Sequence, residues 1–409
     1  MNEKKNFHKF LLLWSGELVS SIGGGLTSFG LGVYVFQETG SASGMALVTL
    51  LGFLPTLLLS VPSGVLADRY DRRLLMMIGD GCSALGVLYI LLCMLGGGAS
   101  LTQICIGVSF SAVFSALLEP SYRATITDLL TKEEFSRANG LISLAGSSRY
   151  LFSPVIAGFL LAVSDVKLLL VMDICTFFLT ILSAAVVRKG LKAKPVEHRE
   201  PFFQSMKGGW QVLRRKKGLL PLVALSSAVT MFIGALQVLE RPLILSFADE
   251  KTLGIAETVC ACGMLISGVI LGIKGLKGHY ARTLGIALML SGLFMFGFGL
   301  LENILFICAF GFLFFATLPF ANNCLDYLAR TNIPDEAQGR AWGMIGFISQ
   351  LGYVVAYGIC GAAADYLGNL LDCGVGRGAA TVVMIGGALL AVTSTFIWIP
   401  KSIRELENN

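Results

Sequence analysis

The chain has 409 residues, of which 55% are hydrophobic and 14% are charged, and its formal net charge is +5 at pH 7. Soluble domains carry about 25% charged residues, which coat their surfaces. The composition therefore excludes a soluble globular protein and indicates a polytopic membrane protein. The 48 glycines agree with this class, because glycine is more frequent in membrane helices than in soluble ones.

Twelve stretches are long and apolar enough to cross a bilayer, since a spanning helix needs about 20 mostly apolar residues. In chain order, the predicted helices lie at 10–37, 43–66, 74–95, 101–122, 137–163, 167–187, 218–246, 254–274, 283–301, 303–328, 339–365 and 376–399. The stretches are continuously apolar and lack the alternation of a membrane β-barrel, which excludes that fold. The first follows several lysines but is too long for a signal peptide, so we predict a permanent helix.

Lys and Arg are distributed unequally between alternate loops. With the N-terminus inside, the cytoplasmic segments hold 26 of the 31 Lys and Arg residues, and the outer loops hold three, Lys167, Lys251 and Arg377. Positive charge accumulates in cytoplasmic loops, and an even number of spans returns the chain to the side where it began. We therefore expect both termini in the cytoplasm. The positive net charge is explained by topology, and nucleic-acid binding is not expected.

One long connection divides the predicted helices into two sets of six. The prediction is an N-terminal half at 1–187, a basic cytoplasmic linker at 188–217 and a C-terminal half with a short tail at 218–409. A weak internal repeat supports two parallel-related halves, an arrangement used by some transporters. At an offset near 203, two pairs of segments match: 63–66 with 267–270, and 137–140 with 340–343.

A charged hairpin connects the second and third predicted helices. It has the pattern G-x-L-A-D-R-x-D-R-R, with Gly64, Asp68, Arg69, Asp71, Arg72 and Arg73 at the named positions. Asp68 can bond the positive N-terminal end of a neighbouring helix, and the arginines can pair with Asp80 or Asp128. Such contacts would act as a latch that sets the balance between two transport states. The alternative is a charge cluster that only fixes orientation.

The fifth predicted helix contains Gly146, Pro154 and Gly158. Small residues let helix backbones approach closely, while Pro154 removes a backbone hydrogen bond and permits a bend. The stretch resembles a weakened form of the Gly- and Pro-rich motif of drug–proton antiporters, with Ser153 where that motif has Gly. The alternative is a packing kink without a role in transport.

Ionisable residues at membrane depth are candidates for function, because they are costly to bury. Glu17 lies about 10 Å into the first predicted helix and Arg149 about 18 Å along the fifth, at 1.5 Å per residue. We predict that Glu17 binds the coupling proton and that Arg149 modulates it. The alternatives are a static pair between these two residues and a side chain that reaches the membrane surface. Asp80 and Asp173 are interpreted as structural.

The central cavity is predicted to be apolar with few charges, which suits a bulky lipophilic or amphipathic solute. Its expected lining residues are Glu119, Phe314, Phe320, Asn322 and Asn323. No Walker A sequence, nucleophile–base pair or metal-ligand cluster occurs in the chain, so we expect no ATPase, no enzyme activity, no cofactor and no metal. The ten cysteines are expected to be free buried thiols.

The hairpin 64–73 resembles the signature loop of the major facilitator superfamily. Together with Phe10–Gly23, Leu31–Val48 and Pro120–Gly140, it resembles the macrolide-efflux and siderophore-exporter branch, drug–proton antiporter family three. The resemblance implies an all-α fold of twelve helices in two six-helix halves, in the bacterial cytoplasmic (inner) membrane. Glu17, Arg149 and the weakened motif depart from the family pattern.

The resemblance implies proton-coupled efflux of lipophilic or macrolide-like compounds by alternating access. The expected partners are protons, a small amphipathic substrate and the lipid bilayer, and the protein is expected to be a monomer. One alternative is a transporter of a dedicated metabolite such as a siderophore. Another is a non-transporting membrane sensor with the same fold, which loss of the hairpin charges would favour. Fold alone does not decide the substrate.

Overall fold

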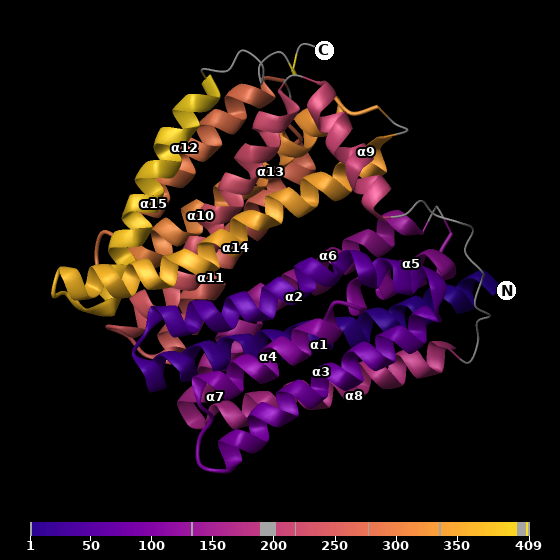
Figure 1. Ribbon diagram of the computed structural model, residues 1–409, viewed down its shortest axis with the longest axis horizontal. Helices are drawn as coiled ribbons and strands as arrows, with labels where there is room; N and C mark the ends of the chain where they lie inside the picture. Colours follow the sequence, from indigo (N-terminus) through magenta and orange to yellow (C-terminus); the bar gives the residue numbers. More distant parts are fainter. Residues whose placement is uncertain are drawn as a thin grey trace. The chain divides into compact units, whose positions relative to one another are not determined.

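The structure is a computed structural model that describes residues 2–131, 134–188, 202–216, 218–276, 278–334, 337–398 and 406–407. Its regular structure over these residues is helical (Figure 1). The helices are α1 (Asn2–Thr39), α2 (Ala42–Arg69), α3 (Arg72–Leu95), α4 (Leu101–Ser115), α5 (Leu118–Leu129), α6 (Phe135–Leu151), α7 (Ser153–Val163), α8 (Val166–Arg188), α9 (Phe202–Arg215), α10 (Leu219–Leu245), α11 (Glu250–Lys274), α12 (Tyr280–Phe298), α13 (Ile304–Arg330), α14 (Gln338–Leu370) and α15 (Gly374–Trp398).

Twelve stretches of the described residues are long and apolar enough to span a membrane, which confirms the predicted number. Most coincide with one helix each. Two contain a pair of consecutive helices, α4 with α5 over Leu101–Leu129 and α6 with α7 over Arg137–Val163. The all-helical, twelve-span architecture predicted from apolar run length is therefore confirmed, while the cytoplasmic placement of the termini stays a prediction.

The break between α6 and α7 occurs at Phe152, where the sequence places Pro154 in the first turn of α7. Proline has no N–H to donate and its ring clashes with the preceding turn, so it ends one helix and begins the next. The helix is thus interrupted at the position where Pro154 permits a bend. Four other prolines, Pro55, Pro62, Pro242 and Pro319, lie inside helices that continue past them.

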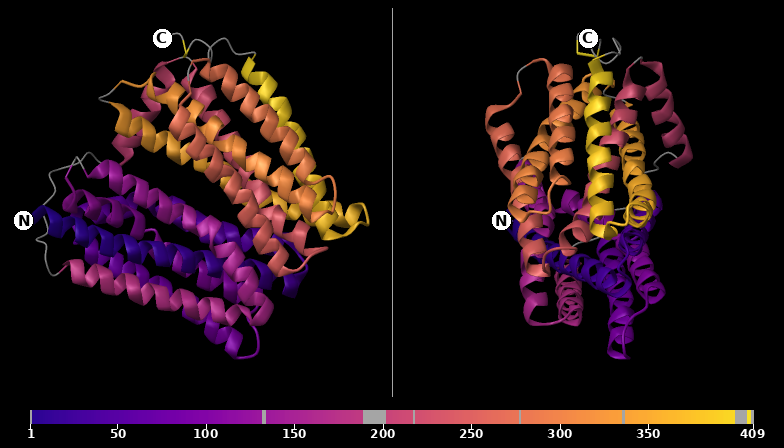
Figure 2. Two further views of the ribbon diagram at one scale, coloured as in Figure 1. Left: turned by 180° about the vertical axis from the view of Figure 1, so that it is seen from behind. Right: turned by 90° about the vertical axis from the view of Figure 1, so that its left-hand side faces the viewer.

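The helices divide into two compact units, residues 1–39 with 47–198 and residues 40–46 with 199–409. In the first unit, α8 packs between α1 and α3, while α4 packs on α3 and α6 and α7 pack on α1. Figure 2 shows α8 running alongside these helices. Three glycines spaced seven residues apart, Gly16, Gly23 and Gly30, lie on the face of α1 that contacts α8. Seven residues make nearly two turns, so the three share one side of the helix.

The second unit repeats this packing pattern. Here α15 packs between α10 and α12, α13 packs on α12, and α14 packs on α10. The two segments matched by the sequence repeat also have corresponding burial: Ser63 and Ser267 are both buried, as are Ala138 and Ala341. The weak repeat in the sequence therefore agrees with a repeat in how the helices pack.

The short segment 40–46 belongs to the second unit because α14 holds it. The Asp365 carboxylate accepts hydrogen bonds from the Ala42 amide (2.8 Å), the Ser43 amide (2.9 Å) and the Ser41 hydroxyl (2.6 Å). Helix N-termini have unpaired amides and a partial positive charge, both of which a carboxylate satisfies. Asp365 therefore acts as an N-cap supplied by another helix.

The predicted linker contains one helix that was not expected from the sequence. Residues 189–201, with Pro195 and Pro201, lie outside the described part of the chain, but α9 follows at Phe202–Arg215. This helix packs against α14, and Leu213 is fully buried. Residues 202–215 have apolar and basic residues at helical spacing, a pattern that is typical of an amphipathic helix and could have predicted α9.

Candidate functional site

Asp71 fixes the turn between α2 and α3. Its backbone is extended and its Oδ1 accepts a hydrogen bond from the Arg73 amide at 3.1 Å, so Asp71 is the N-cap of α3. Its Oδ2 accepts a second bond from Arg188 Nε at 2.7 Å, at the end of α8. Partial burial acts to raise the pKa of Asp71, but the hydrogen bond and charge of Arg188, with the amide bonds, leave its pKa below the ordinary value.

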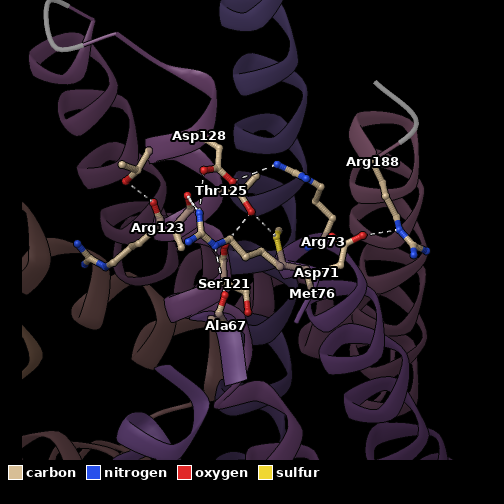
Figure 3. Close-up of polar contacts among 12 residues, drawn as sticks. Ala67, Asp71, Arg73, Met76, Ser121, Arg123, Thr125, Asp128 and Arg188 are labelled. Atoms are coloured by element: carbon tan, nitrogen blue, oxygen red, sulfur yellow. Dashed lines mark hydrogen bonds and ion pairs between the residues drawn. The ribbon is translucent and has the colours of Figure 1, made fainter. Parts of the chain in front are cut away.

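The next two arginines share one carboxylate from another helix. Arg72 Nη1 lies 2.8 Å from Asp128 Oδ1, and Arg73 Nη2 lies 3.2 Å from Asp128 Oδ2. Arg72 also donates to the backbone carbonyls of Ala67 (3.2 Å) and Ala124 (3.0 Å), as Figure 3 shows in part. Of the two acids predicted as partners, Asp128 takes this position.

The remaining hairpin residues lie at the surface of the first unit. Asp68 is one turn from Arg72, with 3.9 Å between the charged atoms, and Arg69 is exposed. A Cβ atom at Gly64 would meet no atom within 4 Å. The hairpin therefore ties α2, α3, α5 and α8 together through Asp71, Arg72 and Arg73, while its role as a latch stays a prediction.

The fifth-helix motif meets α1 through Ser153. The Ser153 side chain is buried, and its hydroxyl donates to the Ile22 carbonyl at 3.0 Å. A Cβ atom on Gly25 would lie 2.5 Å from the Ser153 Cβ, so the glycine on α1 makes room for the serine. Gly158 is buried, whereas Gly146 is exposed. The position that departs from the antiporter motif is thus matched by a glycine on the neighbouring helix.

Glu17 and Arg149 do not form the direct pair that the sequence suggested. The Glu17 carboxylate accepts a hydrogen bond from the Ser21 hydroxyl at 3.5 Å, and among the described residues no ion pair within 4.0 Å involves Arg149. The Arg149 side chain is exposed and Glu17 is half-buried. Arg149 still acts through space, because its charge reaches both Glu17 and Asp173. The expected contact is replaced by a longer-range interaction.

The structure corrects one of the expected cavity residues on α13, Phe314. Phe314 has 0% exposure and is packed inside the second unit, so it does not line an open cavity. On a helix with about 100° per residue, Asn323 lies roughly opposite Phe314, and it is exposed together with Asn322. Phe320 is half-buried. The sequence identified polar and aromatic residues on this helix, but it did not show which of them face the interior of the unit.

Glu119 lies at the surface of α5, paired with Arg123. The two charged groups are 2.9 Å apart, and their side chains are 74% and 67% exposed. An exposed pair one turn apart contributes little to stability. Because the Glu119 side chain is exposed to solvent, it remains a candidate for the cavity surface.

Several charged residues that were not among the predicted site residues are buried in the structure. Asp80 and Asp173 are 3% and 2% exposed in the first unit. In the second, Arg241 Nε lies 2.8 Å from Glu257 Oε1, and Glu240 is also buried. The signal was present, because each is an ionisable residue inside an apolar stretch. Depth along a helix does not reveal this burial, because the packing of neighbouring helices decides the exposure of each side chain.

The described residues contain no group of three or more His, Cys, Asp or Glu arranged to hold a metal ion. All ten cysteines are free thiols, and eight of them lie in spanning helices with buried or half-buried side chains; Cys175 and Cys373 are exposed. The expectation that every thiol is buried is therefore wrong for these two, which lie on outward-facing helix or loop positions.

Solved structures share this fold at low sequence identity. A bacterial homologue of the human lysosomal transporter Spinster matches with a TM-score of 0.71 and 14% identity, covering 98% of this chain and 97% of that one. A bacterial homologue of the iron transporter ferroportin matches with a TM-score of 0.66 and 17% identity, covering 96% and 98%. These likenesses concern the fold.

Curated relatives are more similar in sequence. Macrolide efflux protein A of Streptococcus pyogenes is 27% identical over 374 residues, covering 88% of this chain and 90% of the relative. The enterobactin exporter EntS of Shigella boydii is 26% identical over 352 residues, covering 83% and 81%. The Staphyloferrin A transporter of Staphylococcus aureus is 27% identical over 312 residues, covering 72% and 75%.

The family profile described as Major Facilitator Superfamily matches residues 13–357. That match covers most of the chain and both units, and it agrees with the twelve spans and with the bacterial relatives. The chain belongs to the Major Facilitator Superfamily, and it is a multi-pass transporter of the bacterial inner membrane rather than an enzyme.

Proposed function

We propose that the protein is a monomeric exporter that exchanges protons for lipophilic or macrolide-like compounds by alternating access. The observation that carries the proton coupling is Glu17, a half-buried carboxylate within the span of α1 that accepts a hydrogen bond from the Ser21 hydroxyl. An acid in such surroundings is a functional candidate, because an isolated charge is costly there. The macrolide-efflux relatives supply the substrate class.

In this proposal Glu17 takes up a proton when it is accessible from one side of the membrane and releases it when accessible from the other. The positive charge of Arg149 and the negative charge of Glu119 both reach Glu17. A rearrangement that changes either distance would change the proton affinity of Glu17. Substrate and proton would then bias the same two-state equilibrium in opposite directions, which is the requirement for exchange.

The hairpin would act as the latch on this equilibrium. Asp71, Arg72 and Arg73 hold its base to α5 and α8, which leaves Asp68 and Arg69 at the surface of the unit. Retention of these charges argues against a sensor that has lost transport. A latch needs a rigid base and an accessible contact group, and the hairpin provides both.

The substrate is expected to meet the half-buried Phe320 and the exposed amides of Asn322 and Asn323 on α13. An aromatic surface with a few amide groups suits an amphipathic molecule. The second candidate is a siderophore exporter. It is favoured by the relatives described as an enterobactin exporter and a Staphyloferrin A transporter, which match most of the chain.

The test is dissipation of a preformed pH gradient in inverted membrane vesicles on adding macrolides, dyes or siderophores one at a time. We expect a macrolide or lipophilic dye to dissipate the gradient with wild-type protein and not with Glu17→Gln. Glu302→Gln is the matched control, because it also removes one glutamate carboxylate but at an exposed position between α12 and α13. Dissipation by siderophores alone would select the second candidate. No dissipation by any compound in wild type would contradict proton antiport.

A further inference from the structure

A polar stripe runs along the buried face of α8. Asp173, Thr176, Thr180 and Ser183 follow one another at intervals of three, four and three residues, which places them on one side of the helix. Asp173, Thr180 and Ser183 are 2%, 5% and 6% exposed. The stripe covers about 15 Å of helix, which is half of a hydrocarbon core about 30 Å thick.

The neighbouring helix α1 lies directly against this stripe because glycines face it. A Cβ atom at Gly23 would lie 2.8 Å from Asp173 Oδ1, and one at Gly16 would lie 2.8 Å from Ser183 Oγ. About one turn beyond Gly23, the Thr27 hydroxyl donates to Asp173 Oδ2 at 2.6 Å. The side chains of the stripe therefore touch the α1 backbone, and α1 is the helix that carries Glu17.

The hydroxyls of the stripe can change partners. Each donates to the carbonyl three residues earlier in α8: Thr176 to Asp173, Thr180 to Phe177, and Ser183 to Thr180. The Thr176 hydroxyl also lies 3.4 Å from Asp173 Oδ1. A hydroxyl is both donor and acceptor and rotates freely, so a row of hydroxyls beside carboxylates provides alternative hydrogen-bond arrangements.

A second buried carboxylate faces the stripe from α3. Asp80 is 3% exposed, and α3 packs against α8. The charges that reach Asp80 are those of Glu17 and Asp173, and the charge that reaches Asp173 is that of Arg149. Helices α4 and α7, over Leu101–Ser115 and Ser153–Val163, carry no charged residue. The exposed cation Arg149 acts at longer range on Glu17 and Asp173, but not on Asp80.

Tyr122 on α5 completes the group. It is 5% exposed, and its hydroxyl has no hydrogen-bond partner among the described residues. The charge that reaches this hydroxyl is that of Glu17. Buried polar groups are nearly always hydrogen-bonded, so this unpartnered hydroxyl indicates a site where a further polar species is bound. The phenol is placed to donate to it.

We propose that Asp80, Asp173 and the hydroxyl stripe of α8 form a second proton-binding site that exchanges protons with Glu17, with Tyr122 as the bridging hydroxyl. Three carboxylates within electrostatic reach of one another cannot all hold a charge in a dry interior without nearby cations. They are also not arranged to hold a metal ion, which leaves the proton as the ligand. The inference rests on the proposed proton coupling and extends it beyond Glu17.

The test uses infrared difference spectra of the purified full chain in lipid, recorded between about pH 5 and pH 9. An ordinary carboxylate, with a pKa of about 4, stays ionised throughout this range. We expect a carbonyl band of protonated carboxyl groups in wild type and its partial loss in Asp80→Asn and in Asp173→Asn. Asp80→Glu should keep the band, and it replaces Asp80→Asn if that variant does not fold.

Tyr122→Phe removes only the hydroxyl and is expected to shift the part of the band that belongs to Glu17. Tyr89→Phe is the matched control, because Tyr89 is exposed on α3. A band unchanged in both aspartate variants would overturn the second site even if wild-type vesicles exchange protons for drugs. Loss of the band in vesicles that show no exchange would support the site and contradict the proposed function, so the two failures are distinguishable.

Discussion

The Arg73 guanidinium lies 3.2 Å from the Asp128 carboxylate, although the Arg73 side chain is only 2% exposed. The same carboxylate binds Arg72 at 2.8 Å. One acid on α5 therefore compensates two consecutive arginines at the start of α3. A buried guanidinium that loses its counter-charge is costly, so this carboxylate determines whether the base of the hairpin can stay folded.

Asp128→Asn is expected to destabilise the first unit. The substitution keeps the size of the side chain but removes the charge that compensates Arg73, which leaves a buried cation unpaired. Such a change costs on the order of 2–3 kcal/mol. The measurement is the apparent thermal unfolding midpoint in detergent, which should fall clearly below that of wild type.

The control for Asp128 is Glu119→Gln on the same helix. The Glu119–Arg123 pair has a similar distance, 2.9 Å, but its side chains are more than 60% exposed. Exposed pairs contribute about 0–1 kcal/mol. Equal midpoints for the two variants would show that burial of Arg73 does not matter to the stability of the hairpin.

Asp71 predicts a pH dependence. Because its pKa is lowered in the folded protein, the ionised carboxylate contributes stability at neutral pH. This contribution persists down to about pH 4, where an aspartate in the unfolded chain titrates, and is lost as the pH falls through the lower folded value. Asp71→Asn retains a good N-cap residue and removes the charge. The midpoint difference between wild type and Asp71→Asn should shrink below about pH 4; a constant difference would contradict the Arg188 pair.

The sequence was sufficient for the architecture because apolar run length is set by bilayer thickness, independently of how helices pack. It also indicated Asp128 as a partner of the hairpin arginines, since both lie at helix ends on the same side of the membrane. Burial of an individual side chain is different, because it depends on which helix faces it. Phe314 could not be distinguished from Phe320 without the neighbouring helices, and Asp173 could not be assigned to the α1 interface without the glycines that admit it.

The contact between Glu17 and Arg149 shows the same limit. Their estimated depths were close enough for a pair, but the direction of each side chain depends on how α1 and α6 rotate against each other. In the structure Arg149 is exposed and makes no ion pair within 4.0 Å among the described residues. Residue spacing predicts which positions share a helix face. Predicting a contact between two helices also requires knowing how the helices are rotated relative to each other.

The cap that Asp365 provides to the start of α2 predicts local protection. Asp365→Ala removes the acceptor for the Ala42 and Ser43 amides, which should then exchange with solvent faster. Hydrogen–deuterium exchange of a peptide covering 40–46 measures this. Asp365→Asn retains one acceptor oxygen and should be intermediate. The Ser100 cap of α4 is made within its own helix and should be unaffected. Unchanged exchange in 40–46 would contradict the cap.

Two adjacent glycines on α1 give a direct test of the α1–α8 interface. A Cβ atom at Gly23 would lie 2.8 Å from Asp173 Oδ1, whose carboxylate is held by Thr27, so Gly23→Ala forces the helices apart. Overpacking of this kind costs about 1–3 kcal/mol. A Cβ atom at Gly24 would meet nothing within 4 Å. Since alanine is favoured over glycine in a helix by about 1 kcal/mol, Gly24→Ala should keep or raise the thermal midpoint. The same midpoint for both variants would mean that α8 does not approach α1 at Asp173.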